Sequence, residues 1–254
     1  ALKGFGDVAV GNVVGSNIYN LTFVLGVVSL VRVVPVERSL VHRDGIALVV
    51  SSLLVAGVLF DRTVTRFEGV VLVVLFAGYT AYLLRTARSS EVGPSVEAVP
   101  TPTARTGFRG RDAALLVVGL ALVLVSGDVL VGTAVSLART AGISELVIGG
   151  TIVAAGTSTP EFAVSLIAIR RGSLGVSVGN VVGSNVFNAL CILGIAAVVR
   201  PLSIVPAALE TVAWMVAVSL VMVAALWTGR RLTRPEGGLL AASEAVRWTV
   251  GLLG

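Results

Sequence analysis

One carboxylate lies inside an otherwise apolar stretch of this sequence. The segment GTSTPE, which begins at Gly156, places Glu161 directly after Pro160. Proline cannot donate a helical hydrogen bond to the carbonyl of Gly156 and its ring crowds that turn, so we expect a broken or kinked helix here. The freed carbonyls, the hydroxyls of Thr157 and Ser158, and the Glu161 carboxylate would form a compact cluster of oxygens. Hard cations such as Ca²⁺ take about six to eight oxygen ligands, so this cluster predicts a cation site.

A second polar element occurs twice. VGNVVGSN fills positions 10–17 and again positions 178–185, and each copy is followed three residues later by another asparagine. In a helix, residues four apart share a face, so Ser16 lies on one face with Asn20, as Ser184 does with Asn188. Glycines at spacings of four within each copy allow another helix backbone to approach closely. We interpret the repeat as a duplicated functional element.

The composition indicates a membrane protein. Hydrophobic residues make up 56% of the chain and charged residues 13%, and the mean hydropathy is +0.98, which would leave a soluble domain with too little polar surface. The apolar runs do not alternate with polar residues, as the strands of a membrane barrel do, so we expect an all-α polytopic protein. Reading runs of about 20 apolar residues as spans, we expect eight, at residues 8–31, 46–60, 69–84, 113–137, 146–169, 176–199, 207–227 and 239–253.

A second pair of similar segments has the same spacing as the two copies of VGNVVGSN. The link TRFEG at 65–69 corresponds to TRPEG at 233–237, again 168 residues later. Two matches at one spacing indicate that a multi-helix unit is repeated. The second GNVVGSN span is the fifth after the first, an odd number, so the copies should cross the bilayer in opposite directions. This is the inverted-repeat architecture of many secondary transporters, in which the substrate site lies near the midplane.

The expected organisation has three parts. Residues 1–85 form a first, incomplete half with three transmembrane helices, residues 86–111 form a flexible linker, and residues 112–254 form a second half with five helices. Most arginines fall in alternate links, so the positive-inside rule places the linker in the cytoplasm. We expect an integral protein of the cell membrane. The net charge of +5 is spread over links rather than gathered on one face, which argues against a nucleic-acid partner.

These motifs resemble those of the sodium/calcium exchangers, within the wider cation/calcium antiporter superfamily. The resemblance rests on GTSTPE, the two GNVVGSNxxN elements and the TRxEG links, and it covers nearly the whole chain. It implies ten helices in two inverted halves, of which about eight are present here, and exchange of Ca²⁺ for Na⁺, or for H⁺ in some branches. The ligands that the resemblance implies are Ser16, Asn20, the Ala154 carbonyl, Thr157, Ser158, Glu161, Ser184 and Asn188.

Two departures from the family pattern affect this expectation. A first-half counterpart of Glu161 would fall before Ala1, so we expect an N-terminal truncation and only half of a carboxylate pair. The position of Asn188 is commonly Asp in the family, so the site has less negative charge to offset Ca²⁺. Exchange of Ca²⁺ for Na⁺ by alternating access is our first expectation, and exchange of Ca²⁺ for H⁺ or a non-transporting remnant are the alternatives.

The remaining expectations concern partners and side chains outside this site. We expect no enzyme activity, because the single histidine, His42, lies in a charged link without a nucleophile at catalytic spacing. We expect no cofactor, since Ca²⁺ and Na⁺ or H⁺ would be transported, and a monomeric transport unit in the lipid bilayer. Glu244 and Arg247 are spaced to pair on one helix face. Asp128 lies within a span, where a ligand role is less expected than a position facing a cavity or an interface.

Overall fold

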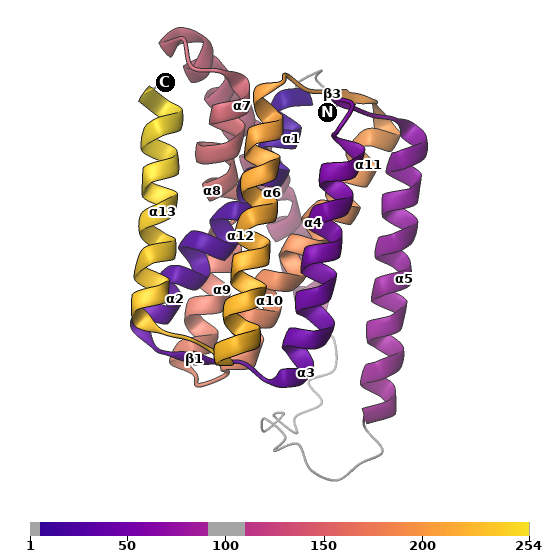
Figure 1. Cartoon of the computed structure of the whole chain (residues 1–254). Helices are drawn as coiled ribbons and strands as arrows, with labels where there is room; N and C mark the ends of the chain where they lie inside the picture. The colour runs from indigo at the N-terminus through magenta and orange to yellow at the C-terminus, as the bar shows by residue number, and fades with distance from the viewer. Residues whose placement is uncertain (1–5, 91–109, 254) are drawn as a thin grey trace.

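The computed structural model describes residues 6–90 and 110–253, which form a bundle of helices with two short strand pairs (Figure 1). Helices are labelled α, strands β and π-helical turns η. The elements before the gap are α1 (Gly6–Tyr19), η1 (Asn20–Val24), α2 (Leu25–Val31), β1 (Val34–Pro35), α3 (Arg38–Leu40), η2 (Val41–Gly45), α4 (Ile46–Val58), β2 (Thr63–Val64) and α5 (Arg66–Ser90).

The second group of elements follows the gap. It consists of α6 (Gly110–Ala141), α7 (Glu145–Ile148), η3 (Gly149–Val153), α8 (Ala154–Thr157), α9 (Thr159–Arg170), α10 (Leu174–Val186), η4 (Phe187–Ile192), α11 (Leu193–Val199), β3 (Leu202–Ser203), α12 (Ala207–Gly229), β4 (Arg231–Leu232) and α13 (Arg234–Leu253). Of the expected linker, residues 91–109 lie outside the described part. At its edges, α5 continues through Ser90 and α6 begins at Gly110.

Each expected span falls on a helix or on a run of consecutive helices. Within the described residues, five helices are long and apolar enough to cross a membrane, or six if the bent pair formed by Glu145–Thr157 and Thr159–Arg170 counts as one span. The expected all-α membrane architecture is therefore confirmed, while the number of eight spans stays a prediction.

The strands reveal an approximate two-fold relation between distant parts of the chain. Strand β1 pairs antiparallel with β4, which places Val34 opposite Leu232, and β2 pairs with β3, which places Val64 opposite Leu202. The second pair is the first shifted by 168 residues with the partners exchanged. Figure 1 shows β1 and β3 at opposite ends of the bundle. The relation is therefore an inversion, as the sequence predicted.

The helices that carry the repeated motif lie at the centre of the bundle. The run Gly6–Val31 is the most buried candidate span, with 78% of its most apolar window inside the structure. In Figure 1 it descends from α1 to α2, whereas α10 and α11 ascend. Both runs pass through a π-helical turn at the third asparagine of the GNVVGSNxxN element, Asn20 in η1 and Asn188 in η4. Such turns are rare and occur frequently at functional sites.

Candidate cation site

The two motif helices are joined by asparagines at their crossing. The Nδ2 of Asn17 donates to the carbonyl of Asn185 over 3.2 Å, and the Nδ2 of Asn185 donates to the carbonyl of Asn17 over 3.0 Å. Asn20 donates to the Oδ1 of Asn185 over 2.9 Å, and Asn188 donates to the Oδ1 of Asn17 over 3.2 Å. Each of these bonds has a counterpart when the residues are shifted by 168 positions, so the crossing follows the two-fold relation of the strands. Because Asn20 and Asn188 donate these bonds through their side-chain nitrogens, their side-chain oxygens remain available to a cation.

Close approach of α1 to α7, η3 and α8 depends on the glycines of the motif. A Cβ atom on Gly11 would lie 2.7 Å from the carbonyl oxygen of Leu146, and one on Gly15 would collide with the backbone of Gly150. Only glycine permits this approach at van der Waals distance. It brings the polar face of α1 against the helix that ends at the predicted break.

Several oxygens meet at this contact. The Oγ of Ser16 lies 3.2 Å from the Oγ1 of Thr157 and 3.4 Å from the carbonyl oxygen of Ala154. The Oγ1 of Thr157 also lies 3.0 Å from the Oδ1 of Asn12 and 3.1 Å from the carbonyl oxygen of Ala154. Each hydroxyl has one proton to donate, so the cluster holds more acceptors than its own hydroxyl protons can satisfy. Such a concentration of acceptors suits a hard cation.

Asn12 is the member of this cluster that the sequence analysis missed. It is the first asparagine of the motif and lies four residues before Ser16, so it shares that face of α1. The recurrence of the same residue as Asn180 was the available signal. Asn180 has a different contact, because its Nδ2 donates to the carbonyl of Glu161 and to the Oγ of Ser165, each over 3.2 Å.

The break before Glu161 is present as predicted. Helices α8 and α9 meet at Ser158 and are bent by 43°, with Pro160 in the first turn of α9. Ser158 is buried at the break, and the side-chain oxygen of Thr159 donates to the carbonyl of Ala155 over 2.9 Å. The break therefore places the Glu161 carboxylate in the first turn of a helix, where the helix dipole favours a negative charge.

Two buried oxygens of the predicted ligand set lack partners. Among the described residues, the Oε2 of Glu161 and the Oδ1 of Asn20 are buried without a hydrogen bond. An acceptor left in this state costs about 1–3 kcal/mol, and more when it is charged. Helix α9, which carries Glu161, packs against η1, which carries Asn20. A cation bound at either oxygen would satisfy it.

The structure does not bring every predicted ligand into this cluster. Ser184 makes no side-chain hydrogen bond in the described part of the chain. Beside it, a Cβ atom on Gly179 or Gly183 would have no neighbouring atom within 4 Å. The α10 face that matches the packed face of α1 is thus uncovered by the described segments. Asn188 reaches the site only through Asn17.

The described residues contain no group of three or more His, Cys, Asp or Glu side chains placed to hold a metal ion. The oxygens that the structure brings together are those of Asn12, Ser16, Thr157 and the Ala154 carbonyl, and Glu161 follows them in the first turn of α9. Asp128 lies in α6, but its side chain is outside the described set.

A buried ionic network adjoins the site, and the predicted pairing of Glu244 with Arg247 is part of it. The Nε of Arg247 donates to Oε2 of Glu244 over 2.9 Å, and an Nη of Arg247 donates to the carbonyl of Gly150 over 2.9 Å. Glu244 also accepts from Thr22 in η1 over 3.2 Å and from Trp248 over 2.7 Å. The network ties α13 to both η1 and η3, a role that the sequence analysis did not foresee.

Comparison with known proteins agrees with this architecture. A family model described as "Sodium/calcium exchanger protein" matches residues 1–85 and 112–243. The protein CaxA of Alkalimonas amylolytica is 36% identical over 94% of this chain and 77% of its own length. The inner membrane protein YrbG of Escherichia coli is 33% identical over 92% of this chain and 72% of its own length.

Solved structures share the fold. The sodium-calcium exchanger NCX_Mj superposes with a TM-score of 0.69 at 28% identity, covering 95% of this chain and 76% of that chain. The H⁺/Ca²⁺ exchanger CAX superposes with a TM-score of 0.73 over 98% of this chain and 68% of that chain. Its identity of 20% makes it evidence for the fold alone.

Proposed function

Because this chain belongs to the sodium/calcium exchanger family, we propose that it exchanges Ca²⁺ for Na⁺ by alternating access. The family is one of antiporters that exchange Ca²⁺ for another cation, and its members are transporters rather than enzymes. We assign the cation to the space between α1 and the break from α8 to α9. The ligands would be Ser16, Thr157, the Ala154 carbonyl, Ser158, Glu161 and Asn20.

The unpartnered Oε2 of Glu161 carries this proposal. A buried carboxylate oxygen without a donor, in the helix that follows the cluster of hydroxyl and carbonyl oxygens, would bind a cation at low cost because no protein hydrogen bond has to be broken. One carboxylate cannot serve two cationic loads at once. Competition for Glu161 would therefore couple the two fluxes.

A proton is the second candidate for the coupling ion. The amides Asn20 and Asn188 cannot titrate, and the Oε2 of Glu161 has no donor among the described residues, so this oxygen can accept a proton as well as a metal ion. In that case Ca²⁺ would enter as Glu161 loses its proton.

Ion-gradient-driven uptake of ⁴⁵Ca²⁺ into vesicles tests the proposal. We expect uptake driven by a Na⁺ gradient at constant pH, and we expect Glu161→Gln to abolish it because the amide keeps the shape and loses the charge. Glu68→Gln is the matched control, since Glu68 is partly exposed and accepts a hydrogen bond from Thr65 at the start of α5. Near-normal uptake by Glu161→Gln would refute the assignment. Uptake that follows a pH gradient without Na⁺ would select proton coupling instead.

We also propose that the end of the bundle with α3, β1 and the C-terminal end of α5 faces the cytoplasm. Figure 1 gathers these elements at one end, and they carry the arginine-rich links. The positive-inside rule assigns such an end to the cytoplasm. Modification of a single introduced cysteine at Arg230, by a reagent that does not cross the membrane, should occur only after the cells are opened.

A further inference from the structure

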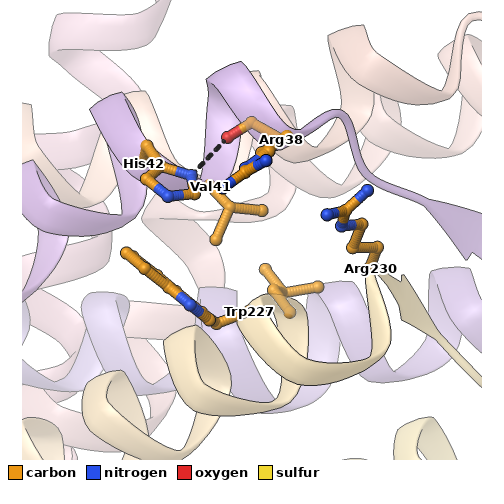
Figure 2. A pocket seen from close by; sticks show the side chains of 6 residues that line it. Arg38, Val41, His42, Trp227 and Arg230 are labelled. Carbon is orange, nitrogen blue, oxygen red and sulfur yellow. Dashed lines mark hydrogen bonds between the residues drawn. The ribbon is translucent and has the colours of Figure 1, made fainter.

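A small cavity at this arginine-rich end lies apart from the cation site. It has a volume of about 60 Å³ and lies between the α3–η2 segment and the C-terminal end of α12. Its lining residues are Arg38, Val41, His42, Leu226, Trp227 and Arg230 (Figure 2). Since a water molecule needs about 10–15 Å³ measured in this way, the cavity has room for several waters or for one small polyatomic ion.

The walls of the cavity are ordered by specific contacts. The Nδ1 of His42 donates to the carbonyl oxygen of Arg38 over 2.8 Å, and the imidazole lies against the indole of Trp227 with 4.1 Å between ring centroids. The side chains of Val41 and Leu226 are buried. Figure 2 shows Arg38 and Arg230 reaching the cavity from two different elements, with His42 and Trp227 along another side.

The charge of the lining selects for an anion. Two of the six lining residues are arginines and none is acidic. The neighbouring carboxylate of Asp44 is engaged by Arg43, with 2.7 Å between Nε and Oδ1. Guanidinium groups match the geometry of phosphate oxygens, which they bind through two parallel N–H donors.

The inverted repeat supplies an internal comparison for this cavity. Arg230 has a left-handed backbone, with φ of 48°, and so does its counterpart Arg62, with φ of 67°. Their carbonyls accept equivalent hydrogen bonds, from Val36 and Ile204. The backbone arrangement is therefore present at both ends of the bundle.

The side chains differ between the two ends. One repeat away, Arg38 corresponds to Pro206, His42 to Glu210 and Trp227 to Leu59. At the other end, Arg62 stands in the place of Arg230. Pro206 stands in the place of Arg38, and Glu210 stands in the place of His42. The fold does not require the basic and aromatic set, because the other end keeps the backbone arrangement without it.

We propose that this cavity binds the phosphate group of an anionic ligand through Arg38 and Arg230. The phosphate ester of an anionic phospholipid headgroup and free phosphate share this chemistry. Trp227 is 47% exposed at the end of a membrane-crossing helix, and tryptophan in that position sits at the level of the headgroups. Basic pockets between helices on the cytoplasmic side are suited to anionic headgroups.

Lipid retention measured by native mass spectrometry tests the proposal without reference to transport. The whole protein is exposed to an equimolar mixture of phosphatidylglycerol and phosphatidylcholine in detergent, and the bound lipids are counted. We expect retention of phosphatidylglycerol over phosphatidylcholine. Arg38→Gln and Arg230→Gln should each reduce that preference by about fivefold, as expected for one basic contact. Arg62→Gln is the matched control and should leave the preference unchanged.

The arms of the experiment distinguish the source of the phosphate. Binding of inorganic phosphate that depends on both arginines, without a lipid preference, would assign the cavity to a free anion. No preference and no phosphate binding in the wild type would overturn the proposal, as would equal losses in Arg62→Gln and Arg230→Gln. The melting temperature of each variant, read in the same detergent, must match that of the wild type for the comparison to count.

Discussion

Helices α1 and α10 carry the same motif and meet different surroundings. In α1, Gly11 and Gly15 pack against the backbone of α7 and η3, whereas the described chain places nothing within 4 Å of a Cβ at Gly179 or Gly183. The motif alone therefore does not make a cation site. We propose that the site forms where a broken helix with its own carbonyl, hydroxyl and carboxylate oxygens lies against the motif.

The largest difference between the two helices should appear in stability. Gly15→Ala forces a methyl group into the backbone of Gly150, so we expect a loss of about 1–3 kcal/mol in the free energy of unfolding. Gly183→Ala has open space and removes a flexible helical glycine, so we expect no loss and a gain of up to about 1 kcal/mol. Thermal unfolding in detergent measures both. Equal damage would mean that a segment outside the described residues also covers α10.

The next prediction concerns the crossing, where the two helices behave alike. Asn17→Ala removes the bond to the Asn185 carbonyl and the acceptor of Asn188, and Asn185→Ala removes the equivalent pair of bonds. We expect each to cost about 1–3 kcal/mol, and the double variant to cost less than the sum, because the two side chains share partners. A strictly additive double variant, measured in the same unfolding assay, would show that the crossing does not act as one unit.

A smaller difference should appear in ion binding. Ser16 contacts Thr157 and the Ala154 carbonyl, whereas Ser184 makes no such contact in the described chain. We expect Ser16→Ala to weaken Ca²⁺ binding about tenfold, which corresponds to about 1.4 kcal/mol. Ser184→Ala should have a smaller effect. Isothermal titration with Ca²⁺ compares the two, and equal losses would place both copies of the motif in one site.

Much of the architecture followed from local rules applied to the sequence. The proline at 160 predicted the break because its effect on a helix is covalent and does not depend on neighbours. The repeat spacing predicted the inversion because an odd number of crossings reverses direction, and the exchanged strand registers of Val34 and Val64 agree with it.

Local rules of this kind do not predict contacts between distant segments. The motif indicated which residues share a face of one helix, but not which helix would cover that face. For this reason Asn12 was missed although it lies beside Ser16. The role of Ser184 stays a prediction. The bond from Arg247 to the carbonyl of Gly150 spans 97 residues, and no periodicity in the sequence encodes it.

The central claim is that one cation binds between α1 and the break before α9, with Glu161 as a ligand. The direct test is the position of Ca²⁺ in crystals of the protein soaked with that ion, found from its anomalous scattering. We predict a site about 2.3–2.6 Å from the Oε2 of Glu161, with the Oγ of Ser16 or the Oγ1 of Thr157 in its coordination shell. Well-ordered Ca²⁺ bound elsewhere, with the Glu161 carboxylate left without a ligand, would contradict the account.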